Sequence, residues 1–171
     1  MSELLGADRL IAKCRKLASK QAGEDIVLRA VHNAAKTVVQ ADAKLRAPAN
    51  DGELRKRIRV RVKMEGDRVV GEVYTNLKYA PYVEFGTGPI GQANHLGISP
   101  EVSVTYKSNP WYVHEDQIDV GSYHFQKIGD FYKMYGQPAQ PYLYPALKDN
   151  QERVSKNISN YVRRKIREQI R

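Results

Sequence analysis

Apolar residues recur at three- and four-residue spacing through the first quarter of the chain, which is the period of an amphipathic helix. Two stripes follow this spacing, separated by a break expected near Gly23: the first holds Leu10, Cys14 and Leu17, and the second holds Ile26, Ala30, Val31, Ala34, Val38, Ala41 and Leu45. Pro48 lacks an amide donor and disfavours helix in the residue before it. The pattern predicts an N-terminal helical region over residues 1–46, helical from about Asp8 to Leu45.

A period of two replaces this spacing from Arg55 onward and predicts a β-strand with one buried face. One face would carry Arg55, Arg57, Arg59, Arg61 and Lys63, and the other Ile58, Val60, Val62 and Met64. Glu65-Gly66-Asp67 supplies a turn, and the stretch from Val69 to Thr75 supplies a return strand. Residues 54–85 are expected to form this β-hairpin and a short apolar helix, stopped by Gly86, that packs beneath the sheet.

Residues 86–136 follow neither period and are predicted to form an extended loop, or insertion, that leaves the domain. They hold seven of the twelve glycines and three of the eight prolines. A strand is possible through Trp111-Tyr112-Val113, and Val102, Val104 and Tyr106 also alternate. Loops of such length in compact domains tend to be functional or mobile. Gly86-Thr87-Gly88 and Gly91 are expected to shape a backbone bend, since neither a helix nor the Lys-Ser/Thr pair of a phosphate loop is evident there.

The helical period returns over residues 142–171, which are predicted to form one helix from about Tyr144 or Pro145 to the end. Its apolar stripe consists of Leu147, Val154, Ile158, Tyr161, Val162, Ile166 and Ile170. Basic residues crowd its last turns, where they complement the negative end of the helix dipole. The patterns together predict one α+β domain over residues 1–171: a small antiparallel sheet packed with a long N-terminal helical region and a C-terminal helix, plus a long loop excursion.

Composition narrows the class of protein without choosing a function. The 171 residues are 42% hydrophobic and 27% charged, which fits one globular domain and argues against disorder over the whole length. No apolar run approaches the ~20 residues needed to cross a bilayer, and no secretory signal begins the chain, so we expect a soluble protein made in a cytoplasm. Cys14, the single cysteine, is interpreted as a small buried apolar residue.

The formal net charge of +9 favours an acidic partner, either nucleic acid or protein. Residues 86–136 contribute five acids and three lysines, a balance of −2, so the remainder carries +11. Two interpretations of the predicted basic strand face stay open. In the first, it is a solvated face with acidic partners on the adjacent strand, although Glu72 is the one acid there. In the second, it is a surface that binds phosphates or an acidic protein neighbour. Tyrosines suit assembly interfaces or the core, and two aromatic clusters are present: Tyr79, Tyr82 and Phe85, and Tyr132, Tyr135, Tyr142 and Tyr144.

Side chains that would support catalysis do not form a known pattern. His114-Glu115-Asp116 with His124 matches no compact zinc spacing. No Gly-x-Ser-x-Gly elbow is present. Glu84 has no evident catalytic partner and would be structural if paired with an arginine or a backbone donor. We therefore expect no enzyme activity, no cofactor and no metal.

Two segments resemble the head–tail joining, neck and tail-completion family of long-tailed bacteriophages, whose members are described as minor tail components. The first lies in Leu77–Gly88 and is similar to the family's YAxYVEFGTG motif, through Tyr79, Ala80, Tyr82, Val83, Glu84, Phe85, Gly86, Thr87 and Gly88. The second opens the last helix with Pro141, Tyr142, Leu143, Pro145, Ala146 and Leu147. A weaker third segment, Arg46-Ala47-Pro48 followed by Gly52-Glu53-Leu54-Arg55, is similar to AP…TGxLRxSI. The long Gly88–Gly136 insertion departs from a minimal family member.

The resemblance implies a virion protein at the head–tail junction, assembled in the host cytoplasm, that forms part of the connector or neck or completes the tail. It implies a ring, sixfold in the virion, beside head-completion and tail-terminator or tail-tube proteins. Such a ring uses heterologous contacts, and we expect the excursion of one subunit to reach its neighbour's cations. The alternative is a nucleic-acid-binding protein that uses the basic strand and the C-terminal helix. The joining role and the nucleic-acid-binding alternative are compatible, because DNA passes through a neck. Residues 55–63 would then either line the channel or face outward.

Overall fold

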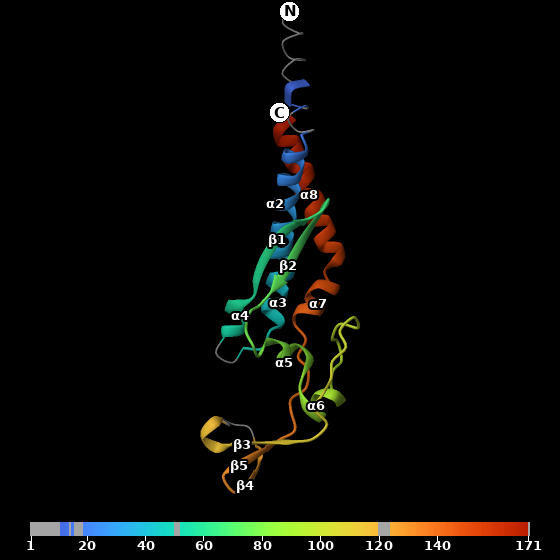
Figure 1. Cartoon of the computed structure of the whole chain (residues 1–171). Coiled ribbons are helices and arrows are strands. Elements are labelled where there is room, and N and C mark those ends of the chain that lie inside the picture. Colours follow the sequence, from blue (N-terminus) through green and yellow to red (C-terminus); the bar gives the residue numbers. More distant parts are fainter. Residues whose placement is uncertain (1–10, 14, 16–18, 50–51, 120–123, 171) are drawn as a thin grey trace, which may run out of the picture.

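The chain forms an elongated α+β molecule, as the fold prediction expected. The computed structural model describes residues 11–13, 15, 19–49, 52–119 and 124–170 (Figure 1). Helices α2 (Lys20–Ala34) and α8 (Gln151–Ile170) run side by side, and a β-hairpin packs against α2. A second small sheet lies at the opposite end of the molecule from the C-terminal end of α8. The interpretation of Cys14 falls outside the described residues.

The N-terminal helix is continuous through Gly23, so the predicted break there is wrong. Helix α2 begins instead after Ser19, whose hydroxyl accepts a hydrogen bond from the amide of Ala22 at 3.4 Å as an N-cap. A π-helical turn, η1 (Ala35–Gln40), follows, and then α3 (Ala41–Arg46). The helix ends before Pro48, as predicted.

The π-helical turn changes which residues of this helix face the core. A π turn spaces its hydrogen bonds by five residues instead of four, so the helix after it is rotated relative to the α-helical pattern. The predicted stripe residues Ala41 and Leu45 are consequently exposed. The buried side chains are Ile26, Ala30, Ala34, Ala35, Val38, Val39, Ala43 and Ala47.

The hairpin starts later than predicted. Residues Glu53–Arg57 form the short helix α4, and strand β1 covers Arg59–Glu65. Strand β2 covers Arg68–Tyr74 and pairs antiparallel with β1, with Arg61 opposite Glu72 and Glu65 opposite Arg68. Gly66, with φ of 61°, lies in the two-residue turn. The alternation of exposed and half-buried residues is confirmed for β1, but not for Arg55 and Arg57.

Residues 86–136 contain more regular structure than a loop. After α5 (Ala80–Phe85) comes α6 (Gly88–Ala93), so the expectation of no helix at these glycines is wrong. A three-stranded antiparallel sheet in the order β3-β5-β4 follows, built from β3 (Trp111–His114), β4 (Gln126–Ile128) and β5 (Phe131–Met134), with a 3₁₀ turn η2 (Glu115–Gln117). The strand at Trp111 is confirmed, whereas Val102–Tyr106 forms none. Helix α5 lies beyond the open end of the hairpin, not beneath its face (Figure 1).

Two helices take the place of the single C-terminal helix that was predicted. Helix α7 (Leu143–Lys148) is followed by its C-cap, Asp149, and α8 begins at Gln151. The side-chain amide of Asn150 donates to the Asp42 carboxylate at 2.7 Å and to the Ala146 carbonyl at 3.0 Å. These bonds compete with helical ones and fix the corner between the two helices.

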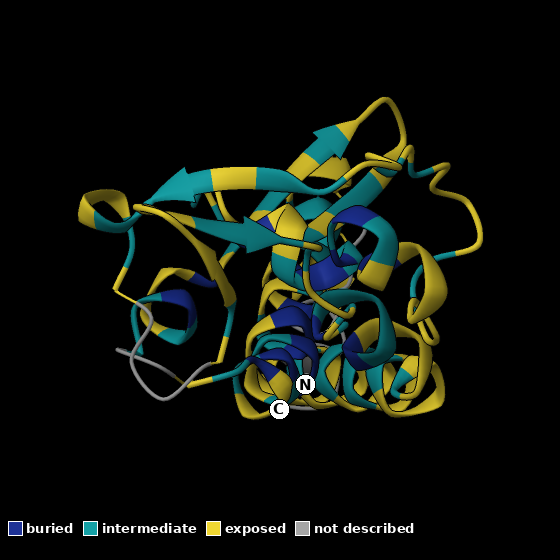
Figure 2. Cartoon of the chain, turned by 90° about the horizontal axis from the view of Figure 1, so that it is seen from below, coloured by how far each residue is buried: buried dark blue, intermediate teal, exposed yellow. Residues whose placement is uncertain are grey.

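The core lies where α3, α4, α5 and α7 meet. It consists of Val39, Ala43, Ala47, Leu54, Ile58, Ala80, Tyr142 and Ala146. Figure 2 shows that the buried residues gather in the helices, while the described strands are half-buried or exposed. Both halves of the sequence contribute to this core, but the described residues of 86–141 do not.

Candidate functional site

The two motif segments lie against each other, and Glu84 joins them. The Glu84 side chain projects from α5 and is 4% exposed. One carboxylate oxygen accepts hydrogen bonds from the amides of Tyr142 at 2.8 Å and Leu143 at 3.0 Å, and the other accepts from Tyr144 at 3.0 Å. These amides form the start of α7, where backbone donors lack helical partners and the dipole favours an anion. Glu84 therefore has backbone donors, which is the condition under which it was expected to be structural.

The glycines of the first motif allow the chain to cross itself. Thr87 and Gln137 exchange backbone hydrogen bonds of 2.9 and 3.1 Å, so the excursion leaves and returns at one point. Gly86 has φ of 76°, and a Cβ atom there would lie 2.7 Å from the amide nitrogen of Ala139. Gly88 has φ of 61°, and a Cβ atom there would lie 2.6 Å from the carbonyl oxygen of Tyr135. Only glycine fits both positions, and the amide of Thr87 is bonded to Gln137 and not free for a phosphate.

The motif residues divide between core and surface. Ala80, Glu84, Gly86, Gly88, Tyr142 and Ala146 are buried. Val83, Phe85, Thr87, Pro141, Leu143 and Pro145 are half-buried. Tyr79, Tyr82 and Leu147 are exposed. The structure therefore brings the two segments together as one junction with three large side chains facing outward.

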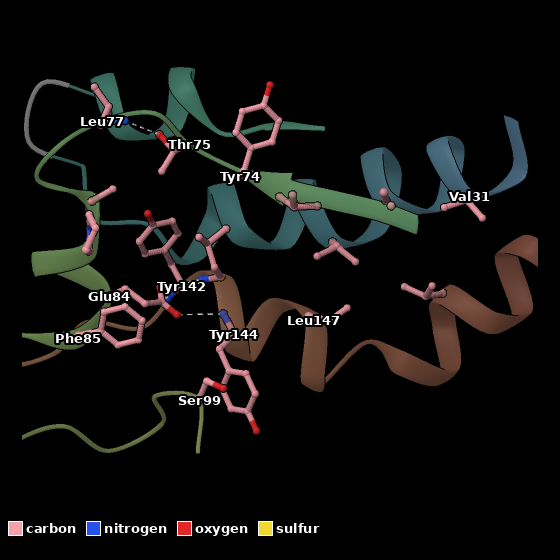
Figure 3. A pocket seen from close by; sticks show the side chains of 18 of the residues that line it. Val31, Tyr74, Thr75, Leu77, Glu84, Phe85, Ser99, Tyr142, Tyr144 and Leu147 are labelled. Atoms are coloured by element: carbon pink, nitrogen blue, oxygen red, sulfur yellow. Dashed lines mark hydrogen bonds between the residues drawn. The ribbon is translucent and has the colours of Figure 1, made fainter. Parts of the chain in front are cut away.

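An apolar groove of about 630 Å³ opens beside β2, between the hairpin and the helices (Figure 3). Val31 of α2, Tyr74 of β2 and Leu147 of α7 lie around it, and Tyr142 lies at its floor. The Tyr142 hydroxyl is buried and has no hydrogen-bond partner among the described residues. Burial, aided by the nearby charge of Glu84, raises the pKa of this phenol well above its usual range, so the hydroxyl stays neutral.

A second groove, of about 920 Å³, lies on the other side of α5. Its lining includes Tyr79, Tyr82 and Phe85, the first aromatic cluster, together with Trp111 of the excursion. The Tyr106 hydroxyl donates to the Phe85 carbonyl at 2.8 Å across this groove. The second tyrosine cluster is not one site: Tyr142 lies in the core, whereas Tyr132 lies on β5 in the distant sheet.

The predicted basic strand face does not exist as five adjacent cations. Arg55 and Arg57 both lie in the helix α4 and not on the strand. Arg55 donates from Nε to the carbonyl of Ala47 at 2.8 Å, and Arg57 pairs with Glu53 at 3.6 Å. Arg59, Arg61 and Lys63 do share the exposed face of β1.

Acids on the hairpin neutralise two of these three cations. Glu72 accepts from Arg61 Nε at 2.8 Å and lies 2.8 Å from Lys63 Nζ, which also contacts Glu65 at 2.6 Å. These bonds lower the pKa of Glu72 and raise the pKa values of Arg61 and Lys63. The solvated face with an acidic partner is therefore the arrangement seen on β1.

The excursion carries its own charge pairs. Glu115 of η2 binds Lys127 of β4, which lowers the pKa of Glu115. His114 Nδ1 lies 3.3 Å from Asp116. Within the described ranges, no three His, Cys, Asp or Glu side chains converge as a metal site would require. None of the helices described is both long and apolar enough to cross a membrane.

Sequence reasoning missed the backbone partners of Glu84, and it noted the basic residues of the last helix without placing them on one exposed face. An acid inside the apolar run of α5 was a signal that its carboxylate meets buried donors. On α8, the signal was the absence of any acid from Arg153 to Arg167.

Comparison with known proteins bears on residues 8–86. They match a model of the family described as "Bacteriophage HK97-gp10, putative tail-component". No curated protein and no solved structure gives a significant match to the chain. The family match confirms the resemblance that the motifs indicated, and it indicates a structural component related to the tail or neck of a phage.

Proposed function

We propose that this protein is a structural protein of a tailed-phage virion that forms part of the head–tail connector or neck, or completes the tail, so that head and tail join. The match of residues 8–86 to a phage tail-component family carries the proposal. That stretch contains most of the first motif, whose Glu84 and Gly86 build the junction with α7. The motif therefore holds together the body of the protein, meaning the described residues outside 86–136. It also places the excursion, which is residues 86–136.

Several copies would form a ring, sixfold in the virion, by heterologous contacts. Each subunit then needs two different complementary surfaces. The body offers the apolar groove beside β2, whose outer edge has no strand partner in the described chain. The excursion offers a projecting sheet with exposed Tyr112, Ile128 and Phe131 and a net charge of −2 over residues 86–136. An excursion that reaches the next, more basic body would supply both halves of the contact.

Partners outside the ring follow from the same role. The ring would contact a head-completion protein on one side and a tail-terminator or tail-tube protein on the other, and DNA would pass through its channel. The protein would be made in the host cytoplasm and end in the virion, at the head–tail junction.

The test is electron microscopy of lysates from a phage whose copy of this gene carries a stop codon at Lys13. We expect filled heads and tails that lie unjoined, or tails of abnormal form, and we expect plasmid-supplied wild-type protein to restore joined particles. Intact, infectious particles without the protein would contradict the joining role.

A further inference from the structure

The solvent face of α8 carries a stripe of cations of which only Arg164 is in an ion pair within the described chain. At 3.6 residues per turn, six residues fall within about 100° of arc, opposite Val154, Ile158 and Val162. They are Arg153, Lys156, Asn160, Arg163, Arg164 and Arg167, all exposed. No acid lies between Arg153 and Arg167 in the sequence. At 1.5 Å per residue the stripe is roughly 21 Å long.

Ion pairing separates this stripe from most of the cations on the hairpin face and from Arg46 of α3. Arg61 and Lys63 on the hairpin are bonded to Glu72, and Arg46 is bonded to Asp42 and Asp149. Two acids of α8 flank the stripe: Glu152 precedes Arg153 in the first turn, and Glu168 lies 2.6 Å from Lys165 and 3.8 Å from Arg164. Of the two elements that the nucleic-acid alternative used, the basic strand and the C-terminal helix, α8 is therefore the one that keeps most of its cations unpaired among the described residues.

A shallow hollow of about 400 Å³ lies at the centre of the last turns. Its lining comprises Asn160, Arg163, Arg164, Arg167 and Glu168. The Arg164 guanidinium is stacked over the Tyr161 ring, 5.2 Å from its centroid, which fixes one side of the hollow. Three guanidinium groups and an amide around a small hollow match the donors that phosphate oxygens accept.

We propose that the exposed face of α8 binds the phosphate backbone of duplex DNA without sequence preference, with Arg163, Arg164 and Arg167 as its main contacts. The composition of the face favours DNA over an acidic protein. A protein interface needs an apolar centre, whereas this face is made of cations and small polar donors, the composition of backbone contacts to nucleic acid. Val154, Ile158 and Val162 lie on the other side of α8, which packs against α2.

The proposal goes beyond the joining role, because an isolated subunit should bind DNA whether or not it joins heads to tails. The experiment is fluorescence anisotropy of the full chain with a duplex of about 30 base pairs and arbitrary sequence, over a series of salt concentrations. We expect binding that weakens steeply with salt.

The test variant replaces Arg163, Arg164 and Arg167 with glutamine, which preserves helix propensity. We expect its affinity to fall at least about tenfold at low salt, and the slope of log K against log salt to fall by about 3, near 0.9 for each lost contact. The matched control replaces Lys36, Arg59 and Lys78, three exposed cations outside α8, with glutamine, and so removes the same charge. It should keep nearly the wild-type slope, and circular dichroism should show equal helix content in all three proteins.

Three results would overturn the proposal. The wild-type chain fails to bind DNA at low salt; the control variant loses as much slope as the α8 variant; or polyglutamate binds the wild-type chain as tightly as DNA at equal charge and salt. The last result would assign the face to carboxylates of a protein neighbour instead of phosphates.

Discussion

At the residue scale, Glu84 has a buried carboxylate that accepts from three backbone amides and pairs with no cation among the described residues. Its hydrogen bonds of 2.8 to 3.0 Å connect α5 to the start of α7, nearly sixty positions along the chain. Bonds between a charged acceptor and neutral donors are stronger than neutral ones, and buried donors left without a partner are costly. The Glu84 carboxylate therefore contributes to the stability of the whole body.

We expect Glu84→Gln to lower the free energy of unfolding by about 2–4 kcal/mol, because the neutral amide replaces one acceptor oxygen with a donor that faces other donors. Urea denaturation should show a lower midpoint at unchanged m-value. Glu168→Gln, which removes an exposed acid of α8, should leave the midpoint nearly unchanged. A loss below about 1 kcal/mol for Glu84→Gln would contradict this role.

Tyr142 gives a prediction of opposite sign. Because its buried hydroxyl has no partner among the described residues, Tyr142→Phe should leave stability unchanged or raise it by up to about 1 kcal/mol at neutral pH. Burial raises the pKa of the folded phenol, so above pH about 10 the unfolded chain binds fewer protons than the folded one and wild-type stability falls. Thermal unfolding between pH 8 and 11 should show a shallower fall for the variant. An equal fall in both proteins would show that Tyr142 does not titrate in this way.

At the element scale, the contact between hairpin and helix depends on Gly71. A Cβ atom at this position of β2 would lie 2.7 Å from Cγ1 of Val31 and 3.7 Å from Cβ of Ala35. Valine side chains in helices hold nearly one rotamer, so Val31 cannot turn aside. The absence of a side chain on β2 therefore allows α2 to pack close to the sheet.

Gly71→Ala should destabilise the protein by about 1–3 kcal/mol through overpacking. In a Val31→Ala background the same substitution should cost less, and denaturation of the four proteins of this double-mutant cycle measures the difference. Gly23→Ala is the matched control, since nothing lies within 4 Å of a Cβ atom there, and it should be neutral or stabilising by up to about 1 kcal/mol. Additive effects of the Gly71 and Val31 substitutions would refute the proposed clash.

Periodicity predicted most elements of the body but misplaced those that depend on distant contacts. The alternation of β1 and the stop before Pro48 are local properties, and both were predictable. The π turn could not be predicted from a period in the sequence. Its last residue, Gln40, donates from its side chain to the carbonyl of Ile58 at 2.7 Å, a contact that exists only in the folded chain. Arg55 likewise fits a strand pattern by spacing, yet it lies in a helix and bonds to Ala47.

At the scale of the whole molecule, the body and the excursion are separable. No described residue of 90–135 belongs to the core cluster, and the amide of Ile90 donates to the carbonyl of Tyr135 at 3.2 Å. The ends of this stretch are therefore adjacent in space. The motifs marked this junction in the sequence, but the amides that Glu84 binds could not be identified without the fold.

Deletion of residues 90–135, with the ends joined by a short Gly-Ser linker, should leave a body that unfolds cooperatively. It should not assemble, because the proposed contact to the neighbouring subunit is lost. Circular dichroism with thermal unfolding checks the first expectation, and complementation of the phage with the Lys13 stop codon checks the second. A folded deletion protein that restores infectious particles would refute the role of the excursion in the ring.

The crossing of Thr87 and Gln137 also bears on how such a chain can change during evolution. Two residues bonded to each other bracket everything between them, so a gain or loss of residues there alters neither the register of the junction nor the buried side chains around it. Apart from the residues that bond to the junction, such as Asn94 and Tyr106, length and composition are then free to drift in this stretch. Related chains would keep the two flanking segments and differ in what they carry between them, which makes the bracketed stretch the place where a phage could adapt to a different neighbour without redesigning the rest.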